Sequence, residues 1–276
     1  MLYIFGRLFF MHKLFKVVNL MQIIRLLYQL IVPESLRPRI KNGQYRIRAL
    51  FYKGNNVHCP CCNHSFDKFL PFGLGWKRRE NAACPSCNSL ERTRLMWLYL
   101  LNEVKIDSMP NANILHFAPE RYIALNLKKM SALNYISADL NPALADIKVN
   151  IENIQFDDNY FDVILCSHVL AHVYDEDKAL TELYRVLKPG GWALIITHIF
   201  ENLEKTFEDK EAKTPKQRLN VYGQDDLARM HGKDFPDRLR NTGFKVKALS
   251  YADKFSESER KKYGLRFNDV FHISIK

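Results

Sequence analysis

The chain has 276 residues, of which 47% are hydrophobic and 26% charged, and its formal net charge is +11. These values exclude an intrinsically disordered chain and leave room for one α/β domain with a smaller appendage. The excess of Lys and Arg suits a nucleic acid, an anionic membrane or an acidic substrate, and a solvated basic surface accounts for it equally well.

Residues 9–32 are strongly apolar, with polar side chains recurring every three or four positions. That spacing predicts an amphipathic helix with one narrow polar stripe. Such a helix suits either a membrane interface or packing against its own domain or a second chain, and Arg25 near its middle disfavours a membrane span. Pro33 and Pro38 are expected to end it, and residues 37–53 follow as a basic connector.

Two nearly identical motifs, CPCCN and CPSCN, lie in the next segment. Aligning them leaves Cys61 without a counterpart and assigns the others as metal ligands. The predicted ligands are Cys59, Cys62, Cys84 and Cys87. Two Cys-x-x-Cys pairs at this separation are typical of a structural zinc ribbon, with an iron–sulfur cluster or a histidine ligand as alternatives. Cysteines used this way indicate a reducing compartment, so we expect a cytoplasmic protein.

A helix is expected over residues 90–104, after the second motif. Asn88 followed by Glu91 resembles a capping box at its start. This helix is expected to join the ribbon to the main domain.

Strand-like and helix-like segments alternate over residues 112–276. The predicted strands include 114–117, 135–138, 147–149 and 161–166, and the predicted helices are 120–130, 175–188 and 224–242. Alternation of this kind predicts a mainly parallel sheet covered on both faces. The last two strands lack a clear intervening helix, which suggests an antiparallel hairpin at one edge.

The segment NILHFAPE reads as a strand, a tight turn and the start of a helix, and Asp139 ends the next predicted strand. A strand, turn, helix and acid in this order form a nucleotide crevice in α/β folds. The usual glycines are missing, because Ala118, Pro119 and Glu120 occupy the turn.

The segments YFDVIL and RVLKPGG, followed by TGFKV, resemble class I S-adenosylmethionine-dependent methyltransferases. Together with the two CPxC motifs, LHFAPE resembles a bacterial subgroup that carries an N-terminal zinc ribbon. The resemblance implies a Rossmann-like, seven-stranded sheet in residues 111–276. With the segments before it, this gives three predicted domains: an amphipathic arm with connector in residues 1–57, a zinc ribbon with linking helix in residues 58–110, and the methyltransferase domain in residues 111–276.

The resemblance also implies a set of cofactor-binding residues. They are Ala118, Pro119, Glu120, Asp139, Leu140, Asn150, Ile151, Cys166 and Ser167. In this assignment Glu120 binds the cationic amino group of S-adenosylmethionine, Asp139 binds the ribose and Asn150 meets the adenine.

A hydroxyl or amine acceptor needs a base, and histidine titrates near neutral pH. The candidate bases are His168, His172 and His198, which follow predicted strands. His168 and His172 lie four apart, so local hydrogen bonding on one helical face is an alternative role. The polar insert 200–235 is expected either to cover the acceptor pocket or to be a solvated lid.

Three functions follow from these features. The first is methyl transfer to a small-molecule, glycan or lipid-linked acceptor, in the cytoplasm or at the inner membrane surface. The second is RNA methylation, with the zinc ribbon, helped by the basic residues 77–79, and the basic connector binding phosphates. The third is a non-catalytic binding protein with a methyltransferase fold.

Overall fold

The structure is a computed structural model that describes residues 31–33, 36–73, 78–266 and 269–276. The chain divides into two compact units, residues 1–51 and 52–276. The expected domain limits at 57/58 and 110/111 remain predictions, and each unit is described by itself.

In the first unit the residues predicted as a basic connector form a helix, α2, over Arg37–Leu50. Pro38 lies in its first turn, where the missing N–H group costs nothing. The predicted amphipathic helix falls almost entirely on residues 1–30, which lie outside the described residues. Among the described helices, none combines the length and apolarity that crossing a bilayer requires.

The second unit begins with two short antiparallel hairpins, which together are called the ribbon. β1 (Lys53–Cys59) pairs with β2 (His64–Phe66), and β3 (Leu70–Phe72) pairs with β4 (Arg79–Ala83). The repeated motifs form the same turn twice, because Asn63 and Asn88 both adopt positive φ angles, 55° and 60°. Their backbone N–H groups donate to the carbonyls of the first cysteine in each motif, Cys59 and Cys84, at 2.9 and 3.0 Å.

The linking helix α3 spans Glu91–Asn102, close to the predicted range. The predicted capping box is wrong, because Leu90 is the N-cap residue and no side chain caps the helix. Glu91 instead accepts two hydrogen bonds from Arg79 of β4, at 2.9 and 3.2 Å. The start of α3 is therefore tied to the second hairpin.

The main domain contains a seven-stranded sheet of order β10–β11–β9–β8–β5–β6–β7. The strands are β5 (Asn113–Phe117), β6 (Asn134–Asp139), β7 (Ile147–Lys148), β8 (Phe161–Ser167), β9 (Leu187–Ile196), β10 (Lys245–Leu249) and β11 (Phe271–Ile275). All neighbouring pairs are parallel except the two that involve β11. The mainly parallel sheet with an antiparallel edge is therefore confirmed.

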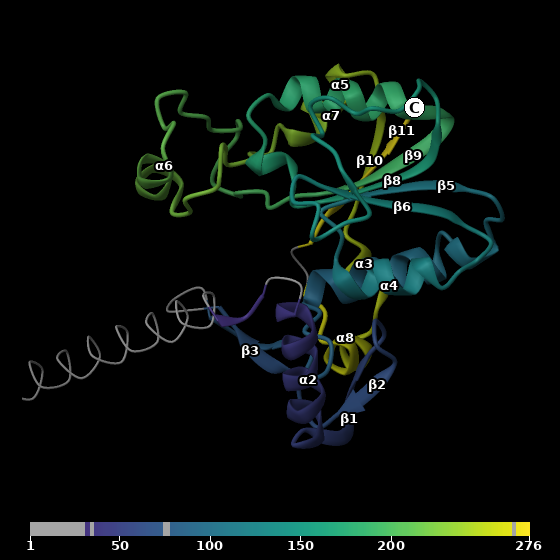
Figure 1. Cartoon of the computed structure of the whole chain (residues 1–276). Helices are drawn as coiled ribbons and strands as arrows, with labels where there is room; N and C mark the ends of the chain where they lie inside the picture. Colours follow the sequence, from purple (N-terminus) through teal and green to yellow (C-terminus); the bar gives the residue numbers. More distant parts are fainter. Residues whose placement is uncertain (1–30, 34–35, 74–77, 267–268) are drawn as a thin grey trace, which may run out of the picture. The chain divides into compact units, whose positions relative to one another are not determined.

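Helices cover both faces of this sheet (Figure 1). α5 (Glu176–Val186) and α7 (Phe235–Asn241) lie on one face, and α3 and α4 (Arg121–Lys128) lie on the other. Apolar side chains of α5 and α7 pack with those of β5, β8 and β9 in one core cluster. Asp175, predicted to start α5, caps it by accepting from the N–H of Lys178.

The predicted helix over residues 224–242 is wrong in its first half, because α7 begins only at Phe235. Gly232 explains the late start, since a Cβ there would lie 2.5 Å from the carbonyl carbon of Lys205. The insert contains its own helix instead, α6 (Pro215–Tyr222), with a capping box between Thr214 and Gln217.

The edge pair β10–β11 is antiparallel as expected, but its connection is no tight hairpin. It contains a 3-10 turn, η4 (Tyr251–Lys254), and the helix α8 (Glu257–Tyr263). α8 packs against β1 of the ribbon. The helix in the connection between β10 and β11 therefore contacts the ribbon.

Candidate functional site

The four cysteines predicted as ligands converge. Their Sγ atoms all lie within 4.8 Å of one another, and the distances Cys59–Cys87 and Cys62–Cys84 are 3.6 and 3.7 Å. Sulfur atoms in a tetrahedral zinc site lie about 3.8 Å apart when each Zn–S bond is about 2.3 Å long. The cluster therefore fits a four-coordinate ion. Cys61 is excluded from it, and its Sγ lies 3.6 Å from the carbonyl oxygen of Thr93.

The turn after β5 lies at the carboxyl edge of the sheet, as predicted. Ala118 adopts a φ of 45°, a left-handed conformation that glycine adopts without strain. Its N–H donates to Ala138 on the neighbouring strand β6, at 2.9 Å. The turn therefore forms without glycine, and Ala118 and Pro119 bring Glu120 to the start of α4.

Sequence reasoning missed the partners of Glu120. His116 on β5 is fully buried, and its Nε2 lies 2.9 Å from Glu120 Oε2 while its Nδ1 lies 2.9 Å from the hydroxyl of Tyr135. Burial alone would raise the pKa of Glu120, but hydrogen bonds from His116 and Ser167 hold that pKa below its usual value. Glu120 is therefore a carboxylate, and these neighbours fix its orientation.

Asp139 ends β6, directly beside β5 in the sheet. Its Oδ1 accepts from the N–H of Asn141 at 2.8 Å, and Oδ2 makes no hydrogen bond within the described ranges. Leu140 next to it is 65% exposed, so an apolar side chain flanks the carboxylate at the surface. Asp139 and Glu120 thus place two carboxylates at the ends of adjacent parallel strands.

The two predicted residues after the third strand, Asn150 and Ile151, differ in exposure. The side chain of Asn150 is exposed, and its Oδ1 accepts from the N–H of Glu152 at 3.0 Å. Ile151 is buried in the core cluster. The Asn150 amide is therefore partly committed to its own turn, which leaves its Nδ2 group as the free donor toward a base.

The end of β8 supplies the next predicted residues. Cys166 is buried in the core cluster and burial raises the pKa of its thiol, so the sulfur lies among apolar side chains. Ser167 is nearly buried and hydrogen-bonds to Glu120. Cys166 therefore belongs to the core next to the site, and Ser167 helps to hold the carboxylate of Glu120.

His168 follows Ser167 with a φ of 56°, and its N–H donates to Ile196 of β9 at 2.7 Å. The expectation of a shared helical face for His168 and His172 is wrong, since only Leu170–His172 form a short 3-10 turn, η3. Burial, followed by the positive charge of Arg92, lowers the pKa of His168 to about 3. His168 is therefore neutral at pH 7 in this state.

The other two histidines have different surroundings. The Nδ1 of His172 lies 3.1 Å from the carbonyl oxygen of Asp226 in the insert. His198 is exposed after β9, and its ring meets Phe200 edge to face at 4.5 Å. Both imidazoles contribute, through their charge, to lowering the pKa of His168.

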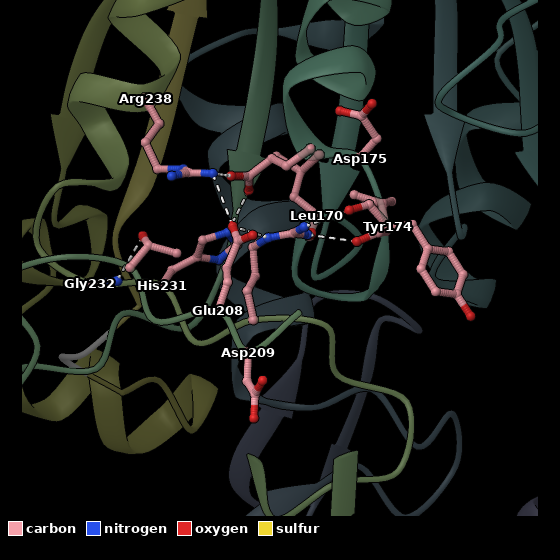
Figure 2. Close-up of polar contacts among 12 residues, drawn as sticks. Leu170, Tyr174, Asp175, Glu208, Asp209, His231, Gly232 and Arg238 are labelled. Atoms are coloured by element: carbon pink, nitrogen blue, oxygen red, sulfur yellow. Dashed lines mark hydrogen bonds and ion pairs between the residues drawn. The ribbon is translucent and has the colours of Figure 1, made fainter. Parts of the chain in front are cut away.

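The insert 200–235 is anchored to the domain rather than being a solvated lid. Arg229 is 2% exposed and donates to the carbonyls of Leu170 and Val173 at 2.6 and 2.8 Å, and to Glu208 at 2.8 Å. Glu208 also pairs with Arg238 at 3.2 Å. These bonds hold the insert against the loop that carries His168 and His172 (Figure 2).

A second set of contacts continues this network into the core. His231 Nε2 lies 2.6 Å from Glu176 Oε1, its Nδ1 lies 2.7 Å from the Thr197 hydroxyl, and Arg238 Nε donates to Glu176 Oε2 at 2.6 Å. Figure 2 shows His231 and Arg238 reaching this network from the insert and α7. Burial would raise the pKa of Glu176, but His231 and the two arginines lower it.

A cleft of about 770 Å³ lies elsewhere, between the ribbon hairpins and α8. Its walls include Lys68, Arg79, Glu91, Lys261 and Arg266, and none of the predicted site residues line it. Three of its four carboxylates are in ion pairs, Glu80 with Arg78, Glu91 with Arg79 and Glu257 with Lys261. We assign the candidate site to the carboxyl edge of the sheet because the two carboxylates and the histidines meet there.

Comparison with known proteins agrees with this location. Residues 111–195 match the family model described as a methyltransferase domain. A ubiquinone/menaquinone biosynthesis C-methyltransferase from Psychromonas ingrahamii is 43% identical over 65 residues, covering 22% of this chain and 26% of that protein. The same enzyme from Vibrio cholerae is 45% identical over 65 residues, covering 22% and 25%. The chain thus spans about a quarter of the length of these relatives.

Among solved structures, an S-adenosylmethionine-dependent methyltransferase from Mesorhizobium loti aligns with a TM-score of 0.46 at 11% identity, covering 66% of this chain and all of that one. The family match covers β5, β6, β7, β8 and most of β9, which carry the site. Residues 111–195 are therefore similar to a methyltransferase domain, and the matches support an S-adenosylmethionine-dependent enzyme.

Proposed function

We propose that this protein is an S-adenosylmethionine-dependent methyltransferase that acts on a small-molecule acceptor, and that its four-cysteine cluster holds a structural zinc ion. The observation that carries the proposal is the pair of carboxylates, Glu120 and Asp139, at the ends of adjacent parallel strands inside the matched domain. Ligands of open α/β sheets bind at this edge.

The residues at this edge fit S-adenosylmethionine. Glu120 is an oriented carboxylate that suits the cationic amino group, and the open Oδ2 of Asp139 suits a ribose hydroxyl. The Nδ2 group of Asn150 can donate to a ring nitrogen of adenine. The bound cofactor supplies an already activated methyl group, so the protein mainly aligns the acceptor and excludes water.

On the acceptor side, the anchored insert and the loop after β8 form the neighbourhood of the three histidines. His168 is a poor base while its pKa is near 3. Its first role is therefore to position the acceptor, and it accepts a proton only if bound acceptor raises its pKa. Small-molecule acceptors are favoured by the partial likeness to quinone-biosynthesis C-methyltransferases.

The ion pairs of the ribbon weaken one support for an RNA methyltransferase. Among the basic residues 77–79 of the ribbon, Arg78 pairs with Glu80 and Arg79 with Glu91, at 3.0 and 2.9 Å. Lys77 lies outside the described residues. Paired guanidinium groups release fewer counterions on meeting phosphates, so this surface gains little from nucleic acid.

Calorimetric titration with S-adenosylmethionine and S-adenosylhomocysteine tests the proposal. Both should bind, and Asp139→Ala should weaken binding about tenfold or more, because it removes charge-assisted hydrogen bonds. The matched control is Asp157→Ala, which changes an exposed aspartate away from β6 and should leave affinity unchanged. Absence of heat with both ligands would rule out the methyltransferase and favour a non-catalytic binding protein.

A further inference from the structure

Two buried nitrogen atoms at the candidate site have no hydrogen-bond partner. Within the described residues, four buried side-chain atoms share this property: Arg92 Nε, His168 Nε2, His272 Nδ1 and Ser274 Oγ. The last two lie on β11, inside the sheet. Arg92 and His168 come from different elements, the first turn of α3 and the residue after β8. Unpaired buried polar atoms are rare in native proteins and need an explanation.

Cys61 contacts both the first turn of α3 and the helix α4. Cys61 Sγ contacts the carbonyl oxygen of Thr93, next to Arg92, and the Cys61 carbonyl accepts from Asn126 of α4 at 2.8 Å. α4 begins directly after Glu120. Cys61 therefore bridges the helix that carries Arg92 and the helix that follows the cofactor turn, which explains why this odd thiol is buried.

The charged and titratable groups near His168 show which kind of partner the two nitrogens lack. Arg92, Glu120, His198 and His172 each affect the pKa of His168, so we treat these groups as one cluster. The carboxylate of Glu120 is already bonded to His116. Asp269 also interacts with Arg92, but within the described residues the two side chains form no ion pair. The cluster therefore has a guanidinium and imidazoles without a committed anion.

We propose that Arg92 and His168 bind an anionic group, a carboxylate or a phosphate, on the methyl acceptor. The Nε–H of an arginine is one arm of the side-on donor fork that matches such oxyanions. His168 Nε2, as the N–H tautomer, donates to the same group. The inference rests on the proposed methyltransferase function, and it makes the linking helix of the ribbon a direct part of the acceptor site.

The test uses the full-length, zinc-loaded protein with inorganic phosphate and acetate as probes, with and without S-adenosylhomocysteine. Nitrogen-15 NMR of the imidazoles follows His168 between pH 5 and pH 8. Without a probe His168 should stay neutral throughout. With a probe that binds, protonation should appear at the acidic end, because a nearby anion favours the imidazolium. A response to phosphate alone or to acetate alone supports the inference and identifies the acceptor's anionic group.

Arg92→Met should abolish this response and Arg92→Lys should keep part of it, while retained zinc content shows that the variants fold. Arg78→Met, at an exposed ribbon arginine paired with Glu80, is the control and should respond like the wild type. No response of His168 to either probe overturns the inference, as does a full response in Arg92→Met. Because S-adenosylhomocysteine binding is measured on the same samples, binding without a probe response overturns only this inference and leaves the proposed function standing.

Discussion

The buried arginine beside the ribbon and the one at the carboxyl edge of the sheet differ in how their nitrogen atoms are hydrogen-bonded. In the ribbon, Arg94 is fully buried and donates to four carbonyl groups, those of Ala82, Ser89, Tyr263 and Gly264, at 2.6 to 2.9 Å. At the carboxyl edge, Arg92 lies only two positions earlier on the same helix, yet its Nε has no partner in the described part of the chain.

This difference separates a structural arginine from a binding one. A region that only has to fold satisfies its buried donors internally, because each unpaired one costs free energy. A region that has to take up a ligand leaves donors for it. The predictions below test whether the ribbon is structural in this sense, starting with the change expected to have the largest effect.

Removal of one zinc ligand should have the largest effect on stability. Cys84→Ser should lose bound zinc and unfold the ribbon, since a structural zinc ion contributes about 10–16 kcal/mol in small zinc domains. Cys61→Ser is the matched control, because Cys61 lies in the same motif but outside the four-sulfur cluster. Elemental analysis should find one zinc per chain in Cys61→Ser and less in Cys84→Ser. Equal zinc in both variants would contradict the ligand assignment.

Arg94→Met should have the next largest effect. Loss of the guanidinium removes a donor from four carbonyl oxygens, of which, among the described residues, only that of Ser89 keeps another, the Cys84 N–H. This should lower the free energy of unfolding by about 3–5 kcal/mol. It should also loosen α8, because two of these carbonyls follow that helix or end it. Denaturant unfolding measures the change, with Arg78→Met at an exposed ion pair as the control. A loss below about 1 kcal/mol, the range of surface ion pairs, would show that Arg94 is dispensable.

Glu176→Gln tests the buried network that anchors the insert. Since the pKa of Glu176 is lowered in the folded state, its charge stabilises the protein above the unfolded pKa of about 4.3, and this stability is lost as the pH falls through the folded pKa. We expect the variant to be about 2–3 kcal/mol less stable than the wild type at pH 7, with the difference shrinking toward about pH 3.5.

Urea unfolding at both pH values measures this difference. Glu204→Gln removes an exposed ion pair with Lys233 in the same insert and should show no such pH dependence. A difference for Glu176→Gln that stays constant between the two pH values would contradict a charged role for Glu176.

The sequence was sufficient where the signal is local. The repeated cysteine motif predicted the metal cluster, and the runs around residues 114–117 and 161–166 predicted two adjacent parallel strands. It failed where a residue's partner lies far along the chain. Arg94 bonds to residues about 170 positions away, and its only local sign of burial is its place directly before the apolar run 95–101.

The insert shows the same limit. In the sequence, Arg218, Tyr222 and Arg229 of the polar insert look available to an acceptor, but all three are buried in contacts within the domain. Charge and polarity in a sequence do not distinguish a side chain that awaits a ligand from one that bonds to distant backbone. His116 was missed for the converse reason, since a histidine inside a strand gives no sign of its contact with Glu120.

The smallest predicted effect compares two capping boxes, one in the insert and one beside the ribbon. Thr214 caps α6 with Gln217, and Ser256 caps α8 with Glu259. Each replacement by alanine removes one cap and should cost about 1 kcal/mol of helix stability.

If α8 unfolds together with the ribbon, Ser256→Ala should lower the midpoint of global unfolding. Thr214→Ala should mainly raise amide hydrogen exchange within α6, because Arg229 and Glu208 hold the insert at its other end. Hydrogen-exchange mass spectrometry distinguishes these outcomes, and equal local responses would show that the insert and the ribbon unfold as one unit.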